Sequence, residues 1–400
     1  MIILPKFQNR IGDFIRYSSV TALSKISGII FMPVLTEFIP KNEIGELSEI
    51  TRYIGLLSLL MGLGYTSQLI RVKNKIETRR LENEFEYFFI IFITISILTF
   101  ILFAGSTLSI SLIAISATTL SALKFQRVKY RLQDKIKDYS LIEYLFIVMS
   151  LGFSFIGLYF IPSFASRLIA LVISYILALA VYKRKDPIRF KKPVSFIYLT
   201  ESISVLPHTL LRWIRVRSDV ILIGLFFSSL VQADFAIALS VSSLVLAFFD
   251  TYNQWFLKIS KDCLDRQEHR RWAVLVTISV LVFVTVASLF SLSTNYIYLF
   301  LRWESFMTGI PWIKFLLMIY ISRAGINLLT SFFNYYRLNR VLSIVTISSS
   351  VLYLSGSLYF LNVNSIEFFL KFSVALESLV FISLTLILLK RINFQITRAL

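Results

Sequence analysis

The chain has little of the residues from which catalytic and metal sites are built. Its 400 residues include one cysteine, two histidines and 13 glycines. The single Cys263 excludes an intramolecular disulfide framework, and no group of His and Cys has the spacing of metal ligands. No glycine-rich phosphate loop is present, which disfavours ATP-driven pumping by this chain. These absences predict a protein that is not an enzyme and that needs no cofactor or metal.

Charged residues are also scarce, at 16% of the chain, whereas hydrophobic residues make up 56%. A soluble chain of this length would not need that much apolar surface. Twelve apolar segments are long enough to cross the hydrocarbon core as helices, for which roughly 20 residues suffice. They lie at 18–39, 47–70, 85–104, 106–123, 140–161, 164–182, 200–227, 232–258, 273–301, 311–335, 341–361 and 366–389. The predicted fold class is all-α, a polytopic membrane protein with 12 transmembrane helices.

Lysine and arginine alternate between the gaps that separate these spans. Of 41 such residues, 30 lie at the N-terminus, in alternate gaps and in the C-terminal tail, whereas the other gaps hold only Lys41 and Arg302. Because cytoplasmic loops carry the excess of Lys and Arg, both termini are predicted to be cytoplasmic. Met1–Tyr17 has no small-residue cleavage site, so the first span is expected to be an uncleaved insertion signal.

The net charge of +18 could indicate a nucleic-acid partner. That interpretation is rejected, because the charge is spread over short loops that would contact the headgroups of anionic membrane lipids. The longest inward gap, residues 183–199, falls midway. We therefore expect an N-terminal six-helix bundle over 1–182, a cytoplasmic linker at 183–199 and a C-terminal six-helix bundle over 200–400. Two such bundles around a central cavity are typical of a transporter built from two repeats.

The seventh span has the most unusual composition. On an ideal helix, Glu201, His208, Arg212, Arg215 and Asp219 fall within about 40° of one line, and Arg217 falls nearly opposite. An arginine that faces lipid at a helix centre costs roughly 2.5–3.5 kcal/mol. These arginines are therefore expected to face protein or a water-filled cavity. Two alternatives remain open: internal pairing of Arg215 with Asp219, or a misplaced span.

Charged residues in other spans extend this pattern. Lys25 in the first span and Arg323 in the tenth are further candidates for contact with substrate, together with Arg212, Arg215 and Arg217. An excess of positive charge in a cavity suits an anionic substrate. Glu201, Asp219 and His208 are candidates for coupling to an ion gradient; Glu143 and Glu377 are alternative proton carriers.

Five segments resemble the motifs of one transporter family, in span order along the whole chain: residues 21–38, 43–48, 62–71, 217–224 and 253–256. The fourth reads Arg217-Ser-Asp219-Val-Ile-Leu-Ile-Gly224 and is similar to a Ser-Asp-Arg-Leu-Ile-Leu-Gly pattern in the seventh span of that family. The chain resembles Wzx-type O-antigen flippases of the multidrug/oligosaccharidyl-lipid/polysaccharide exporter superfamily. It departs from the pattern at Val220, where a basic residue is common, and at Gln232-Ala-Asp234, which lacks the usual glycine.

The resemblance implies a flippase that moves undecaprenyl-diphosphate-linked O-antigen repeat units from the cytoplasmic to the periplasmic leaflet, with ion-gradient coupling. It would act in lipopolysaccharide biosynthesis beside an O-antigen polymerase and a chain-length regulator. One rival is a drug or cation exporter of the same superfamily, which should have acidic residues in its cavity. An O-antigen polymerase is disfavoured because the outward gaps, such as the single Gly105, are too short for a catalytic loop.

Overall fold

The computed structural model describes residues 19, 23, 27, 28, 31–71, 75–103, 108–133, 135–185, 196–336, 338–363 and 365–399. Within these ranges the chain is helical, without a β-strand. The helices are α2 (Lys41–Met61), α3 (Tyr65–Arg71), α4 (Lys75–Phe103), α5 (Leu108–Leu132), α6 (Ile136–Phe160), α7 (Phe164–Lys185), α8 (Ile197–Arg217), α9 (Asp219–Phe226), α10 (Ser229–Asp265), α11 (His269–Phe300), η1 (Glu304–Gly309), α12 (Ile310–Tyr335), α13 (Asn339–Asn362) and α14 (Ile366–Ala399).

The helices follow the predicted spans. Every span from the second to the twelfth coincides with one helix or with two consecutive helices, and the described part of the first span is helical over 31–38. In the described part of the chain, seven helices are long and apolar enough to cross a membrane: Lys137–Phe160, Phe164–Arg184, Ser229–Asn253, His269–Phe300, Glu304–Phe333, Arg340–Asn362 and Ile366–Lys390. The predicted class of a polytopic helical membrane protein is confirmed.

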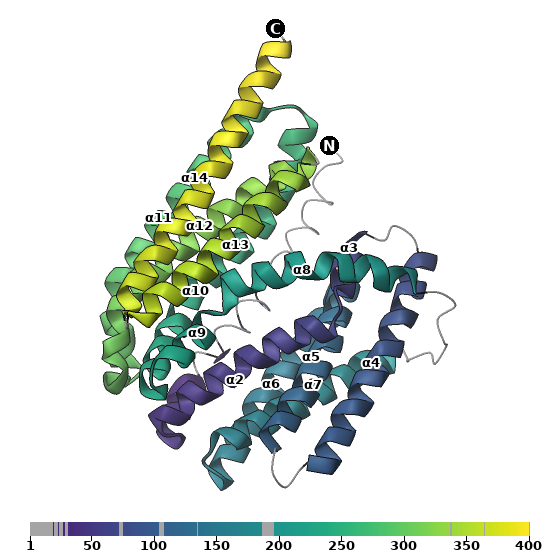
Figure 1. Cartoon of the computed structure of the whole chain (residues 1–400), viewed down its shortest axis with the longest axis vertical. Coiled ribbons are helices and arrows are strands. Elements are labelled where there is room, and N and C mark those ends of the chain that lie inside the picture. The colour runs from purple at the N-terminus through teal and green to yellow at the C-terminus, as the bar shows by residue number, and fades with distance from the viewer. Residues whose placement is uncertain are drawn as a thin grey trace. The chain divides into compact units, whose positions relative to one another are not determined.

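The chain divides into two compact units, Met1–Ile221 and Leu222–Leu400. The sequence placed the division earlier, at the linker 183–199, of which residues 186–195 lie outside the described ranges. Helix α8 groups with the first unit because it packs against α2, α3 and α4 (Figure 1). A predicted boundary of the membrane bundles at 183–199 therefore stays a prediction, while the packing boundary lies in α9.

Two close contacts attach α8 to the first unit. The backbone N–H of Leu199, in the first turn of α8, donates to Glu84 Oε2 at 3.0 Å, and Tyr65 donates its hydroxyl to the same oxygen at 3.3 Å. A carboxylate from α4 thus satisfies one of the unpaired N–H groups at the start of α8. Gly64 has a φ of +76°, and a Cβ atom there would lie 2.5 Å from the carbonyl oxygen of Ser202. The turn before α3 therefore approaches the backbone of α8 directly.

The first unit has an aromatic core with ion pairs at the ends of its helices. The rings of Phe85 and Phe125 stack with centroids 4.1 Å apart, within a buried cluster that also contains Tyr65, Leu69, Leu81, Ala122 and Leu179. Lys129 on α5 pairs with Glu82 on α4 at 2.7 Å. Several basic residues that the sequence assigned to loops are thus partly neutralised by neighbouring helices.

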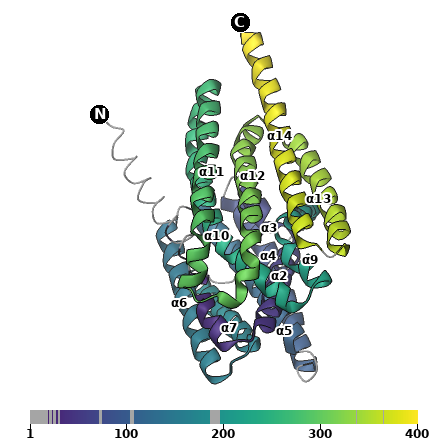
Figure 2. The same cartoon turned by 90° about the vertical axis from the view of Figure 1, so that its left-hand side faces the viewer.

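In the second unit α10–α14 run side by side (Figure 2). Helix α12 packs against α10, α11 and α14 and is the central element of this unit. Its Arg323 pairs with Glu377 of α14, with Nε 2.9 Å from Oε1, and both side chains are buried. This pair joins two long helices at a position that would lie within the membrane.

Candidate functional site

The seventh predicted span is formed by two helices. Helix α8 ends at Arg217, and α9 begins at Asp219. Between them, Ser218 donates its hydroxyl to the carbonyl oxygen of Ile214 at 2.6 Å, a local hydrogen bond that competes with the regular helical pattern. The sequence analysis treated the span as one continuous helix. That assumption is wrong at Ser218, so Asp219 is on a different helix from Arg215.

The predicted residues of this span divide into an exposed and a buried group. Glu201 and Arg212 are exposed, whereas Arg215 and Asp219 are 6% and 7% exposed. Both buried residues have interaction partners. His208 is half-buried, and the positive charges of Arg212 and Arg215 act on it. The predicted line of charges therefore has an exposed part and a packed part.

Arg217 belongs to a group of cations that the sequence analysis did not assemble. Lys124 on α5 is half-buried, and its Nζ donates to Ser58 Oγ on α2 at 2.7 Å. Burial, together with the positive charges of Arg127 and Arg217, lowers the pKa of Lys124 to about 8. These three residues, Lys124, Arg127 and Arg217, are called the inner cationic cluster.

The inner cationic cluster is only partly neutralised. Arg127 pairs with Glu143 at 2.5 Å, and the guanidinium carbon of Arg127 lies 5.3 Å from the centre of the Phe146 ring. Among the described residues, neither Lys124 nor Arg217 has an ion-pair partner. Two positive charges of the first unit are thus left available for an external anion.

Sequence reasoning missed Lys124 because the rise in charge after residue 123 was interpreted as a loop. Helix α5 continues to Leu132. A signal was present: Phe125 and Val128 continue the apolar spacing of a helix beyond Lys124, and Phe125 is fully buried. An apolar pattern that persists through basic residues therefore indicates a helix that extends beyond the membrane core.

The remaining candidates are in other positions. Lys25 lies outside the described residues. Arg323 lies in the second unit, where Glu377 already neutralises it. Glu143 is engaged by Arg127 and lies 3.5 Å from the hydroxyl of Tyr182. No group of three or more His, Cys, Asp and Glu side chains suited to a metal ion occurs in the described ranges.

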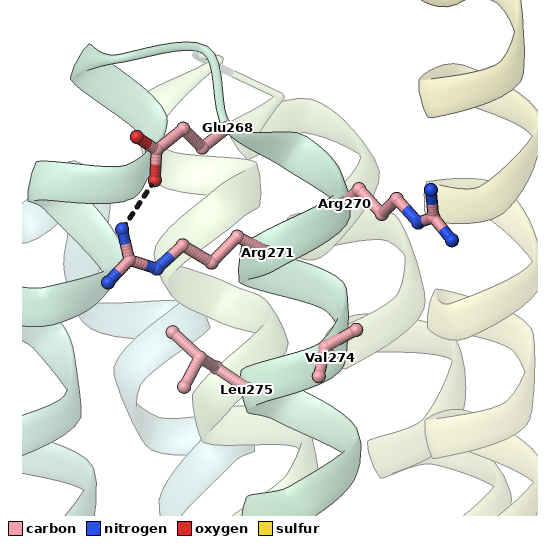
Figure 3. Close-up of a pocket in the computed structure, with 5 residues that line it drawn as sticks. All are labelled: Glu268, Arg270, Arg271, Val274 and Leu275. Atoms are coloured by element: carbon pink, nitrogen blue, oxygen red, sulfur yellow. Dashed lines mark hydrogen bonds and ion pairs between the residues drawn. The ribbon is translucent and has the colours of Figure 1, made fainter.

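One surface pocket of about 530 Å³ lies at the start of α11 (Figure 3). It is lined by Glu268, Arg270, Arg271, Val274 and Leu275, and Glu268 pairs with Arg271 at 2.9 Å. Figure 3 shows Arg270 pointing away from this pair. None of the predicted site residues lines this pocket, so it is separate from the inner cationic cluster.

Known proteins resemble the chain over part of its sequence and in its fold. A family model described as polysaccharide biosynthesis protein matches residues 12–123. No curated protein sequence matches the chain. The structure of a multidrug resistance MATE family transporter of the MOP superfamily, in an inward-facing conformation, aligns with a TM-score of 0.63 at 12% identity over 93% of this chain and 98% of its own.

Two further MATE structures agree. A variant of a MATE transporter aligns with a TM-score of 0.65 at 11% identity, over 95% of this chain and 96% of its own. A variant of a Vibrio cholerae MATE transporter gives 0.61 at 15% identity, over 96% and 97%. The chain therefore has the fold of a MATE-type membrane transporter. The family-model match over residues 12–123 agrees with the polysaccharide-related resemblance that the motifs indicated.

Proposed function

We propose that the chain is a flippase that moves undecaprenyl-diphosphate-linked O-antigen repeat units from the cytoplasmic to the periplasmic leaflet of the bacterial inner membrane. The observation that carries the proposal is the inner cationic cluster, in which Lys124 and Arg217 have no ion-pair partner among the described residues. A diphosphate bears about two negative charges and cannot cross hydrocarbon unaided. Charge-assisted hydrogen bonds from these cations would replace its hydration, while the polyprenyl tail stays in lipid.

The proposal is tested by complementing a strain that lacks its O-antigen flippase. Lys124→Ala and Arg217→Ala should each reduce surface O-antigen about tenfold or more, the effect of one lost hydrogen bond to a charged group. Arg270→Ala is the matched control, because Arg270 is an exposed arginine outside the cluster. It should give wild-type O-antigen at equal protein levels. Wild-type ladders from both cluster variants would refute the proposed site.

A drug or cation exporter is the second candidate, favoured by the MATE fold. The charge of the inner cationic cluster argues against it, since positive side chains repel a cationic substrate. A strain that lacks both its O-antigen flippase and its own drug exporters distinguishes the two functions. The flippase proposal expects the chain to restore O-antigen without conferring resistance to cationic dyes. Resistance without O-antigen would establish the exporter instead.

Coupling to a proton gradient is part of the proposal. Glu201, His208 and Asp219 lie on the two helices of the seventh span, which also carries Arg212 and Arg215. A carboxylate beside an arginine stays ionised, so a diphosphate that takes over the arginine would leave the carboxylate able to accept a proton. In proteoliposomes, Glu201→Gln or Asp219→Asn should lose dependence on an imposed pH gradient and still bind substrate. If the transport rate of the wild type does not change with an imposed pH or sodium gradient, the result would instead indicate facilitated flipping, driven by polymerisation of the product.

A further inference from the structure

Arg167 occupies an unusual position in the first unit. It lies in the first turn of α7, which begins at Phe164. By the predicted topology this turn is at the periplasmic end of the sixth span, where the neighbouring outward gaps hold almost no basic residues. Positive side chains are also disfavoured near a helix N-terminus, where the helix dipole is positive. The charge of Arg167 is therefore repelled by the helix dipole at the start of α7.

The contacts of Arg167 hold the guanidinium without neutralising it. Its Nη1 donates to the carbonyl oxygen of Ser150 at 3.0 Å, to Ser150 Oγ at 3.3 Å and to Ser154 Oγ, all on α6. The guanidinium carbon lies 5.0 Å from the centre of the Phe31 ring. All of these partners are uncharged.

No carboxylate compensates this charge in the described part of the chain. Glu43 Oε2 accepts the backbone N–H of Phe164 at 3.0 Å, at the start of the same helix, and it forms no ion pair with Arg167. The Nε and Nη2 groups of Arg167 have no hydrogen-bond partner among the described residues. The serines thus hold Arg167 at Nη1, and the N–H groups of Nε and Nη2 can donate to a ligand.

We propose that Arg167 is an outer phosphate site, which binds the diphosphate of the lipid-linked substrate near the periplasmic end of the first unit. The inner cationic cluster would hold the same group at the cytoplasmic end. The proposal rests on the flippase function. A guanidinium presents a planar fork of donors that matches phosphate oxygens, and the serines fix its orientation in advance. Two sites at opposite ends of one unit would let the diphosphate pass from one cation to the next.

A purely structural role is the competing explanation, since Arg167 also joins α7 to α6. Two substitutions separate the roles. Arg167→Gln keeps an amide donor for the serines but removes the charge. Arg167→Lys keeps the charge but loses the fork of donors. A phosphate site expects the glutamine variant to lose binding at unchanged thermal stability and the lysine variant to bind better than the glutamine variant. A structural link expects the thermal stability of both variants to fall.

Binding to the purified full-length protein is the direct measurement, with undecaprenyl diphosphate as the probe and inorganic diphosphate as the competitor. Arg167→Gln should weaken binding about tenfold, as expected for the loss of a charge-assisted hydrogen bond. Arg167→Lys should recover part of this loss. Unchanged affinity in Arg167→Gln would overturn the outer site. If the wild type binds undecaprenyl diphosphate and inorganic diphosphate with equal affinity, the assignment to a lipid-linked ligand would be overturned.

Accessibility gives a readout that does not depend on transport. Cys263 is the only cysteine, so Cys263→Ser provides a background without thiols. In that background Arg167→Cys should react with a membrane-impermeant thiol reagent added from the periplasm. Ser174→Cys, at a fully buried position on the same helix, should not react, whereas Ile161→Cys, at a position 63% exposed, should. An unreactive Arg167→Cys would overturn the outer site.

The failures are distinguishable. If the wild type neither restores O-antigen nor binds undecaprenyl diphosphate, the flippase function itself fails. If the wild type does both and Arg167→Gln matches it in both, only the outer phosphate site fails.

Discussion

Lys124 shows how burial and charge together prepare a side chain for an anion. Burial and two neighbouring arginines favour its neutral form, which is why its pKa falls to about 8. An anion bound beside it would favour the protonated form and raise that pKa. The affinity for an anion is therefore full below pH 8 and decreases as the pH rises through about 8 towards the pKa of the bound state.

We expect the dissociation constant of the wild type for undecaprenyl diphosphate to increase between pH 7 and pH 9, measured on the purified protein. In Lys124→Arg the same profile should be flat, because an arginine stays protonated throughout this range. The arginine variant is the control, since it keeps the positive charge. A wild-type profile as flat as that of the variant would show that Lys124 is not near the bound anion.

Arg323 and Glu377 form a buried ion pair. Replacing only one of the two residues should lower the stability of the fold. Breaking a buried ion pair by removing one partner typically destabilises a protein by about 3–5 kcal/mol, because the other charge is left uncompensated. We expect Glu377→Gln and Arg323→Met each to lower the thermal stability of the purified protein. The double variant Arg323→Met/Glu377→Leu should recover most of it.

The double variant also tests the role that the sequence gave to Arg323. Restored stability with wild-type O-antigen would indicate that Arg323 serves only the packing of α12 and α14. Restored stability without O-antigen would indicate that Arg323 meets the substrate, as the sequence analysis expected.

At the scale of the element, the attachment of α8 to the first unit depends on one glycine. Gly64→Ala would place a side chain in the left-handed region, with its Cβ 2.5 Å from Ser202 O. We expect a loss of about 1–3 kcal/mol, typical of strained backbone, and faster hydrogen exchange in the first turns of α8. Gly152→Ala is the matched control, because a Cβ there meets nothing within 4 Å. It should be neutral or slightly stabilising. Equal behaviour of the two variants would contradict the close contact.

The elements themselves were largely predictable, because a span is specified by apolar length alone. The second to twelfth spans were found from this signal, and α7 and α13 coincide with it closely. The break at Ser218 was not found, since serine is common inside helices and its hydrogen bond to Ile214 is a matter of local geometry. The inner cationic cluster was not found either. Lys124 and Arg217 are far apart in sequence, and their charges come together because α2 packs against both α5 and α8.

At the scale of the whole molecule, the alternation of basic gaps predicts an orientation in the membrane. Reporter fusions after Arg266 should indicate the cytoplasm, and fusions after Lys41 and Arg302 the periplasm. These three positions lie between or at the ends of helices, so an inserted reporter should disturb packing little. A cytoplasmic signal at Arg302 would reverse the second unit. A cytoplasmic signal at Lys41 would reverse the first unit and invalidate the assignment of inner and outer ends on which both phosphate sites depend.

Helix α14 has a practical consequence for imaging. Its 34 residues extend about 51 Å at 1.5 Å per residue, well beyond the roughly 30 Å of a bilayer core. By the predicted topology, the turns of α14 beyond residue 389 would project from the lipid. A globular marker fused in helical register to these turns would move rigidly with the second unit. In electron cryomicroscopy such a marker would supply an alignment feature outside the detergent micelle.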